Sequence, residues 1–368
     1  MPKKQSHERA NAARGYSKKP FRLLLINYAM NSKDSVFAHQ IEVVRKLAPF
    51  YLSIEVTTND FKKESLPDNV TVSIVKWRPG QNLRNAIRFL IIFFKVMWTS
   101  RPKKVFSHMT EVQSALIAPF LRLIGKPHLL WYAHTSKSLS LRFTHFFASG
   151  IVTSTPGSCP IRSPKIFPIG QAVDEALFKN ARSSFKRRSI KAIHIGRLDP
   201  SKNILELIST LSSERFRGKF KSLTLIGEST INNGDYFQKI LALTQVQNPR
   251  FDTTLVGPVP RNELPRYLKS HDVFVHAFIG SLDKSLVEAT MSGIPVVTNN
   301  PEYHSSFGTW SQATSRISPT FAEELEAYLS TNQNVVSREI KKRRDLAKKG
   351  HSLDSWINNL AQILDKEI

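Results

Sequence analysis

The sequence contains a single cysteine and few acidic residues. The first shortage excludes disulfide-linked and cysteine-based metal proteins, and the second makes the chain strongly basic. One cysteine, Cys159, among 368 residues allows no internal disulfide and no cysteine-based metal site. This usage is typical of a reducing compartment such as the cytoplasm, and we interpret Cys159 as a packing residue. Only 29 Asp and Glu stand against 53 Lys and Arg, so the net charge is +24.

The sequence also lacks an apolar run that could cross a bilayer. The longest lies in residues 86–98, AIRFLIIFFKVMW, which Arg88 and Lys95 interrupt, far below the roughly 20 residues required. We interpret this segment as a buried helix. The alternative is a helix in the membrane interface whose cations reach headgroups, namely Arg84, Arg88, Lys95 and Arg101. Residues 1–20 are polar and basic without the apolar core of a signal peptide, so we expect a disordered tail.

The positive charge is concentrated in the first half of the chain. Residues 1–172 contain 26 basic and 8 acidic residues, a net charge of +18, whereas residues 173–368 contain 27 and 21, a net charge of +6. Such a field favours an anionic partner: nucleic acid, anionic lipid or a phosphorylated substrate. No helix-turn-helix, zinc-finger or aromatic-rich RNA-binding signature is present, so nucleic acid is supported by charge alone.

Short strand-like runs alternate with helical ones, the pattern of parallel sheets with crossover helices. In the first half we predict strands at 21–28, 52–58, 70–75, 104–109, 128–134, 150–155 and 165–170. After a connector the pattern restarts, with strands predicted at 191–196, 222–227, 251–257, 272–278 and 294–298. We therefore predict two doubly wound α/β domains, 21–172 and 173–351. We expect 341–350 to be a solvated charge run and the amphipathic segment 352–368 to complete the first domain.

Polar or glycine residues stand at the ends of these strands. Ligands of doubly wound sheets bind beyond the carboxyl ends of the strands. The residues there are Asn31, His108, His134, Ser154, Gly196, Arg197, Gly227, Gly257 and Gly280. If the two sheets open toward each other, these residues surround one cleft.

The stretch HIGRLDPSKN, residues 194–203, combines a strand end with two cations. Gly196 permits a sharp turn, and Arg197 and Lys202 flank the start of the next helix. Two fixed cations beside a helix N-terminus form an anion site that suits a diphosphate. The alternative is a surface turn in which the cations pair with nearby acids, and the motif alone does not decide.

Residues 278–298, FIGSLDKSLVEATMSGIPVVT, place one acid on an apolar helix. The helix begins near Asp283, interpreted as its N-cap, so the free N–H groups of Lys284 and Ser285 point to an anion. Glu288 lies one turn after Lys284, and the simplest interpretation is a Lys–Glu pair worth roughly a few tenths of a kcal/mol. The functional alternative is a carboxylate that binds two vicinal hydroxyls, as on a ribose.

Together with FDTTLVGPVP and IGQAVDEALF, these motifs resemble a known family. The chain looks like a GT-B-fold glycosyltransferase of family 4, the retaining, nucleotide-sugar-dependent group of the glycosyl transferases group 1 type. The resemblance rests on Gly-Arg-Leu-Asp-x-x-Lys-Asn, Glu-Ala-x-x-x-Gly-x-Pro-Val-Val and Val-Asp-x-x-x-Phe, spread over about 130 residues of the second domain. The first domain is matched mainly by its strand–helix rhythm and by LLWYAH. The implied fold is two Rossmann-like domains facing across a cleft.

The resemblance implies a role for each motif residue in the second domain. Arg197 and Lys202 would bind the donor diphosphate and neutralise the leaving nucleotide diphosphate. Glu288 would bind the ribose hydroxyls. The backbone of Val256 and Gly257 would contact the base.

In the first domain the resemblance implies a catalytic role for His134 beside the transferred sugar, although a strand-end histidine is more often a packing residue. The chain also departs from the family pattern. Gly280 stands where an acid commonly precedes Glu288 by eight residues, and Asp283 replaces a motif glycine. NYAMNSKDS, residues 27–35, lacks the usual glycine pair. We expect an altered donor pocket in which Asp283 supplies the sugar-hydroxyl contact that Gly280 cannot.

No Asp-x-Asp pair and no metal-ligand spacing of His, Cys or acids occurs, which argues against the other large glycosyltransferase fold and against a metal. We predict a metal-independent, retaining hexosyltransferase without a cofactor. It would move a sugar from a nucleotide diphosphate donor to a glycan or lipid-linked acceptor in cell-envelope or polysaccharide synthesis. The expected location is cytoplasmic, peripheral on the anionic inner face of the cytoplasmic membrane. The alternatives are a catalytically weakened GT-B binding or scaffold protein and a sugar-nucleotide epimerase.

Overall fold

A computed structural model of the chain describes residues 19–366, except 32–36, 38, 63, 180–187, 231–232, 246–250 and 312–317. The chain divides into two compact units. Unit 1 contains the residues up to Ile169 and those from Trp356 onward, and unit 2 is Gly170–Ser355. Of the expected tail at 1–20, residues 1–18 lie outside the described residues, while Lys19 and Pro20 begin the first strand.

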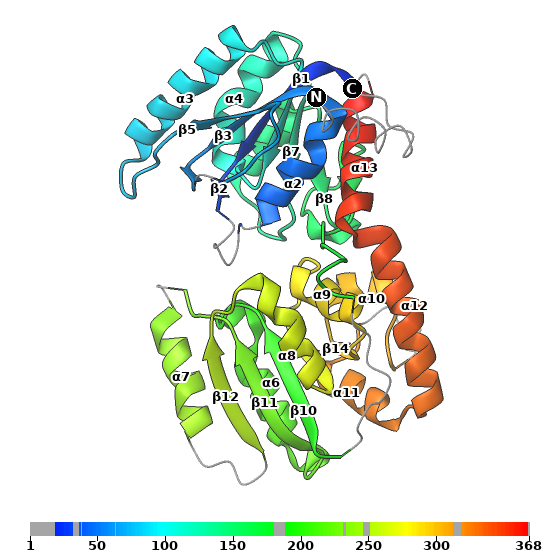
Figure 1. The fold of residues 1–368 in the computed structure, drawn as a ribbon. Helices are drawn as coiled ribbons and strands as arrows, with labels where there is room; N and C mark the ends of the chain where they lie inside the picture. Colours follow the sequence, from blue (N-terminus) through cyan, green and yellow to red (C-terminus); the bar gives the residue numbers. More distant parts are fainter. Residues whose placement is uncertain are drawn as a thin grey trace. The chain divides into compact units, whose positions relative to one another are not determined.

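Unit 1 is built on a seven-stranded parallel sheet in the order β5-β3-β1-β6-β7-β8-β9 (Figure 1). The strands are β1 Lys19–Asn27, β3 Tyr51–Thr58, β5 Val70–Ile74, β6 Lys104–His108, β7 His128–Trp131, β8 Gly150–Thr153 and β9 Ile166–Pro168. Its helices include α2 His39–Leu47, α3 Asn82–Thr99, α4 Glu111–Leu123 and α5 Leu139–Phe147, and the short strands β2 Ala29–Met30 and β4 Asp60–Phe61 pair separately. Every residue of β6, β7 and β8 is buried, as expected for central strands of a covered parallel sheet.

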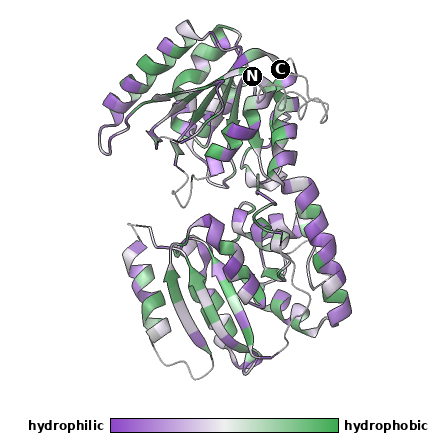
Figure 2. Cartoon of the chain, viewed as in Figure 1, coloured by the Kyte–Doolittle hydropathy of each residue, from purple (hydrophilic) through white to green (hydrophobic). Residues whose placement is uncertain are grey.

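Unit 2 repeats this architecture with five parallel strands in the order β12-β11-β10-β13-β14. The strands are β10 Ile190–Ile195, β11 Phe220–Ile226, β12 Asp252–Gly257, β13 Val273–His276 and β14 Val296–Thr298. The helices are α6 Ile204–Ser212, α7 Gly234–Gln245, α8 Leu264–Ser270, α9 Lys284–Ser292, α10 Pro301–Phe307, α11 Phe321–Ser330 and α12 Gln333–His351. Figure 2 shows both green and purple residues on these helices, the composition of helices that cover a sheet with one face.

The last helix, α13 Leu353–Asp365, carries residues that belong to the core of unit 1. The Trp356 ring lies 5.6 Å from that of His108 and 5.3 Å from that of Trp131, measured between ring centroids. Lys104 of β6 donates through Nζ to the carbonyl oxygens of Leu364 and Lys366. The two ends of the chain therefore contribute to one unit.

The expectations for one charged and one apolar segment hold in part. Residues 341–350 lie within α12 and most of them are exposed, as expected for a solvated charge run, but Arg343 is buried. Arg343 donates to the Thr309 carbonyl at 2.9 Å and lies 4.1 Å from the Trp310 ring centroid. Residues 86–98 lie in α3, which buries only one of its faces. None of the helices among the described residues has the length and apolar content needed to cross a bilayer.

Candidate functional site

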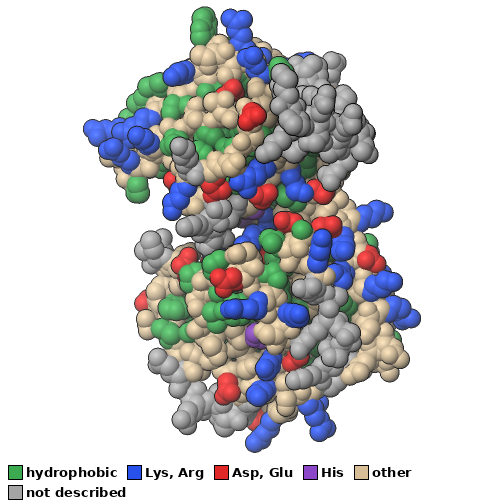
Figure 3. All heavy atoms as spheres, in the orientation of Figure 1, with side chains coloured by type: hydrophobic (Ala, Val, Ile, Leu, Met, Phe, Trp, Pro, Cys, Tyr) green, Lys and Arg blue, Asp and Glu red, His purple; other side chains and the backbone are tan. Residues whose placement is uncertain are grey.

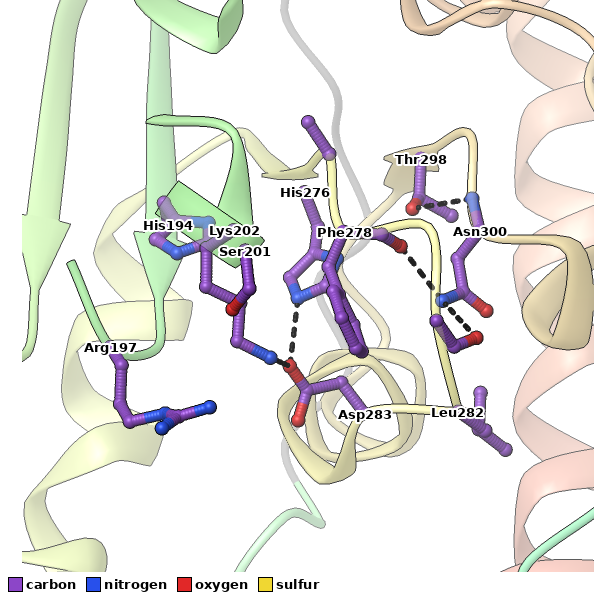
Figure 4. A network of polar contacts seen from close by, with 12 residues as sticks. His194, Arg197, Ser201, Lys202, His276, Phe278, Leu282, Asp283, Thr298 and Asn300 are labelled. Carbon is purple, nitrogen blue, oxygen red and sulfur yellow. Dashed lines mark hydrogen bonds and ion pairs between the residues drawn. The ribbon is translucent and has the colours of Figure 1, made fainter. Parts of the chain in front are cut away.

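The candidate site lies where two loops of unit 2 meet at the carboxyl ends of neighbouring strands. Strands β10 and β13 pair in parallel, so the residues that follow them lie at the same edge of the sheet. After β10 the chain forms the short 3-10 helix Pro200–Lys202. Asn203, with a φ of 50°, then donates from Nδ2 to the Ala277 carbonyl at 3.0 Å. This bond ties the loop after β10 to the loop after β13. Lys202 of the first loop and Asp283 of the second also meet at this junction (Figure 4).

Lys202 points into this junction and pairs with Asp283. The Lys202 side chain is only 7% exposed, and its Nζ donates to Oδ2 of Asp283. The same ammonium lies 3.8 Å from the centroid of the Phe278 ring, in cation–π geometry. His276 donates from Nε2 to the same Asp283 oxygen at 3.1 Å. The positive charge of Lys202 is therefore balanced within the protein.

Asp283 stands at the N-cap position of α9 but does not act as its cap. Its side chain accepts no hydrogen bond from the N–H groups of the first turn. Burial raises the pKa of Asp283, but the charge of Lys202 and the hydrogen bond from His276 outweigh burial and hold this pKa well below the usual carboxyl range. An ionised carboxylate thus sits beside Lys202 and the N-terminus of α9, where the sequence predicted a diphosphate. Capping was the wrong interpretation because the buried ammonium binds the carboxylate more strongly than a neutral backbone N–H group would.

Gly280 has no room for a side chain. A Cβ atom at this position would lie 2.1 Å from Cζ of Phe278, and Gly280 itself is buried. The Phe278 ring therefore occupies the space that an acid at position 280 would need. The sequence shows that position 280 lacks the acid. Only the structure shows that the Phe278 ring fills this space and that the Lys202 ammonium lies over the ring.

Two further residues hold this loop and were missed in the sequence. Asn300, fully buried at the start of α10, donates from Nδ2 to the carbonyls of Phe278 at 2.8 Å and of Gly280 at 3.2 Å. Gln171 donates to the carbonyl of Leu282. The Asn-Pro sequence at a helix start could have identified Asn300 as a cap, and it does accept from the Tyr303 N–H at 2.8 Å.

Glu288 pairs with Arg261, which sequence reasoning also missed. Arg261 follows β12 and donates from Nη2 to Oε1 of Glu288, so the expected Lys284–Glu288 pair is not the one that forms. Burial lowers the pKa of Arg261 to about 10 against the opposing charge of Asp174, which leaves the guanidinium charged at pH 7. Burial, and then the charge of Arg261, lower the pKa of Lys284 well below its usual value. The sequence signal that could have identified Arg261 is its position as a cation after a third strand of unit 2, β12.

The remaining predicted residues of unit 2 line the same edge of the sheet. Arg197 is exposed over 57% of its side chain and lies 3.4 Å from Asp199. Gly257, with a φ of 80°, accepts at its carbonyl from the Gly227 N–H at 3.0 Å, and Val256 before it is partly buried. A Cβ at Gly227 would lie 1.9 Å from the Gly196 carbonyl oxygen, so only glycine allows these two turns to touch. Ser285 has a buried Oγ for which no partner exists among the described residues.

His134 belongs to unit 1 and is exposed. Strand β7 ends at Trp131, so His134 lies three residues beyond it instead of within a strand. Its ring centroid is 5.6 Å from that of Tyr132. Among the described residues, no group of three or more His, Cys, Asp or Glu side chains is arranged to hold a metal ion.

His194, buried at the end of β10, makes the stability of unit 2 depend on pH. Burial lowers the pKa of His194 to about 3, from about 6.5 in an unfolded chain, while Nδ1 donates to the Val275 carbonyl at 3.0 Å. The unfolded state therefore binds a proton first as the pH falls. The stabilisation is complete above pH 6.5 and declines down to about pH 3.

We expect the free energy of unfolding to fall by about 2 kcal/mol between pH 6.5 and 4.5 through this histidine. Urea unfolding across this range measures the effect, with His194→Gln as the comparison. The variant should be less stable at pH 7 but lose less stability on acidification. Parallel pH profiles of the two proteins would contradict the assignment.

Two parallel α/β units of seven and five strands define the GT-B fold. Residues 178–310 match the family model of glycosyl transferases group 1. A search of curated proteins finds no match.

Three solved structures show the likeness of fold. HepE from Anabaena in complex with UDP-glucose is similar with a TM-score of 0.68 and 14% identity, over 94% of this chain and 99% of that one. Sucrose-phosphate synthase from Thermosynechococcus elongatus has a TM-score of 0.72 and 12% identity, over 94% and 98%. The lipopolysaccharide outer core galactosyltransferase WaaB has a TM-score of 0.64 and 12% identity, over 94% and 100%.

Proposed function

We propose that the chain transfers a sugar from a nucleotide diphosphate donor to a glycan or lipid-linked acceptor. The observation that carries this proposal is a set of three cations at the carboxyl edge of the unit 2 sheet, within the group 1 match: Arg197, Lys202 and Arg261. The solved structure of HepE with UDP-glucose and the naming of WaaB as a galactosyltransferase support the same chemistry.

The donor diphosphate would be held by cations and by backbone N–H groups. Arg197 is exposed enough to reach it, and the free N–H groups of Lys284 and Ser285 begin α9. A bound diphosphate competes with Asp283 for Lys202, and the ammonium then stabilises the charge that develops on the leaving nucleotide diphosphate. These protein cations supply the neutralisation that a metal provides elsewhere, so we propose a metal-independent reaction.

The other predicted residues receive roles around this anion. Glu288, kept ionised and oriented by Arg261, would bind the ribose hydroxyls, and the backbone of Val256 and Gly257 would contact the base. Asp283 would position Lys202 and reach the donor sugar with its second oxygen. His134 of unit 1 would lie near the transferred hexose. The family-4 motifs support retention of the anomeric configuration, which NMR of the product tests.

A thermal-shift screen with nucleotide sugars tests donor binding. At one hundred times the dissociation constant, a ligand that binds only the folded state stabilises it by about 2.7 kcal/mol, which raises Tm by a few degrees. We expect nucleoside diphosphates and their sugars to raise Tm, and Arg197→Ala to reduce the shift. Sugar alone and nucleoside are the controls. The absence of any shift with nucleoside diphosphates, or an equal shift in Arg197→Ala, would reject the proposal.

The second candidate is a binding or scaffold protein on the same frame. The ion pair of Lys202 with Asp283 and the Phe278 ring over Gly280 favour it, because both fill space where a donor sugar would act. Donor binding without sugar transfer or hydrolysis would establish this alternative. Conversion of the nucleotide sugar in the absence of acceptor would indicate an epimerase instead.

We further propose attachment to the anionic inner face of the cytoplasmic membrane, where a lipid-linked acceptor of cell-envelope or polysaccharide synthesis is presented. The net charge of +18 in residues 1–172 supports this location.

A further inference from the structure

Helix α3 exposes a continuous apolar stripe. Its inner face is buried through Asn85, Phe89, Phe93 and Val96. On the opposite side, large apolar side chains follow one another at intervals of four, four, three and four residues and are all exposed: Leu83, Ile87, Ile91, Phe94 and Trp98. Trp98 is 80% exposed and Leu83 76%. A helix that only covered a sheet would carry polar residues on this outer face.

The next two helices show the same feature. Helix α4 exposes Val112, Leu116 and Leu123, and α5 exposes Leu139, Phe143 and Phe146. Both sets recur at helical spacing, so each helix has an apolar stripe in addition to its buried face. Three consecutive helices thus expose large apolar side chains to water. Apolar residues scattered singly over a surface are common, whereas a contiguous apolar patch is not.

Contacts between the helices join the three stripes. The rings of Phe94 in α3 and Phe120 in α4 meet edge to face, 4.9 Å apart. Between α4 and α5 lies an open groove of about 650 Å³, lined by Ala115, Leu116, Leu139, Ser140, Arg142 and Phe143. Arg142 also lines a second hollow of about 300 Å³, together with Lys137 and His145. An apolar groove therefore adjoins a basic one. We call the exposed face of α3, α4 and α5 the three-helix face.

The segment of sequence that contains the three helices carries almost only positive charge. Between Asp68 and Asp174 the sequence has 14 Lys and Arg residues and one acid, Glu111. Glu111 accepts hydrogen bonds from the hydroxyls of Ser138 and Ser140. Exposed cations stand on each helix: Arg84 and Lys95 on α3, Arg122 on α4 and Arg142 on α5. Figure 3 shows hydrophobic side chains at the surface of unit 1 with Lys and Arg side chains beside them.

We propose that the three-helix face docks on an anionic lipid bilayer. The stripes enter the boundary between headgroups and acyl chains, and the flanking cations bind lipid phosphates. The groove between α4 and α5 accommodates one acyl chain, with Arg142 and Lys137 at its phosphate. Nucleic acid is a poorer match for this surface than a bilayer, because its phosphates make no favourable contact with the eleven exposed apolar side chains. The inference rests on the proposed function only for its purpose, since lipid binding itself requires no donor.

Cosedimentation with vesicles of phosphatidylcholine, with and without phosphatidylglycerol, tests this surface. We expect binding to depend on phosphatidylglycerol and to weaken at high salt. The variant Ile87→Asp/Ile91→Asp/Trp98→Asp should lose affinity by at least about tenfold, because each change removes apolar area and adds repulsion. Leu243→Asp, a change of an exposed apolar residue on α7 of unit 2, is the control and should bind as the wild type does.

Charge reversal provides the second arm. Arg84→Glu, Lys95→Glu and Arg142→Glu should each weaken binding on the order of fivefold or more. Lys341→Glu and Lys349→Glu change the net charge equally on exposed positions of α12 and should have little effect.

Three results would overturn the inference: unchanged binding in the apolar variant, equal binding to neutral vesicles, or full competition by duplex DNA that the apolar changes do not affect. Donor thermal shifts measured on the same variants separate the two proposals. A protein that binds vesicles but shows no rise in Tm with nucleotide sugars would count against the proposed function alone.

Discussion

Replacing Arg197 and Lys202 together by alanine is expected to lower kcat/KM for sugar transfer by a factor of about 10³ or more. Both side chains flank the N-terminal side of α6, where the proposed function places the leaving diphosphate. Their loss removes stabilisation that exists mainly in the transition state, so kcat should fall with kcat/KM. Steady-state release of the nucleotide diphosphate with a saturating donor measures the effect. Undiminished transfer in the double variant would show that these cations do not act on the diphosphate.

The pairing of Lys202 with Asp283 requires a control for stability. Removing the ammonium alone leaves a largely buried carboxylate with His276 as its one remaining partner among the described residues, which we expect to destabilise the fold by about 1–3 kcal/mol. Lys202→Met combined with Asp283→Asn removes both charges and should restore most of that stability. If transfer returns along with stability, Lys202 has a structural role only. If the fold recovers while transfer stays low, the Lys202–Asp283 pair acts on the donor.

Gly280→Ala is expected to destabilise the protein by about 2–3 kcal/mol, a large effect for one methyl group. The added Cβ would lie 2.1 Å from the Phe278 ring, while Asn300 holds the backbone of both residues. The ring must therefore move, and with it the cation–π contact of Lys202. Urea unfolding measures the stability, and the donor KM reports the displacement of Lys202.

The second half of this experiment replaces the ring. In a Phe278→Ala background the space is open, so Gly280→Ala should cost less than about 0.5 kcal/mol, and the two changes should couple strongly in a double-mutant cycle. Gly350→Ala is the matched control, because a Cβ there meets no atom within 4 Å and the residue lies in α12. Additive effects of the two loop changes would mean that the ring does not exclude a side chain at position 280.

Much of the fold follows from local patterns. Continuous apolar runs such as FRLLLIN and alternating helical segments predicted two parallel α/β sheets, and the structure contains two such sheets. The strand predicted at 104–109 is β6, Lys104–His108. The sequence pattern did not predict the helix Leu139–Phe147, because its apolar residues lie on the solvent side as well as on the core side. Periodicity shows that residues share a face without showing what covers that face.

The sequence by itself determined the chemical types at the site. It placed cations, acids and glycines at strand ends of unit 2, and strand ends of a parallel sheet share one edge. Hydrophobic periodicity and residue spacing are local properties of the sequence. They are therefore enough to predict the helices and strands and the glycines of tight turns.

Only the tertiary structure decided which of these residues meet. Lys202 and Asp283 are 81 residues apart, and Arg261 and Glu288 are 27 apart. Their pairing depends on the order of strands in the sheet and on side-chain volumes such as that of Phe278, neither of which a local pattern contains. The same holds for the three-helix face, whose stripes become one surface only when α3, α4 and α5 pack side by side.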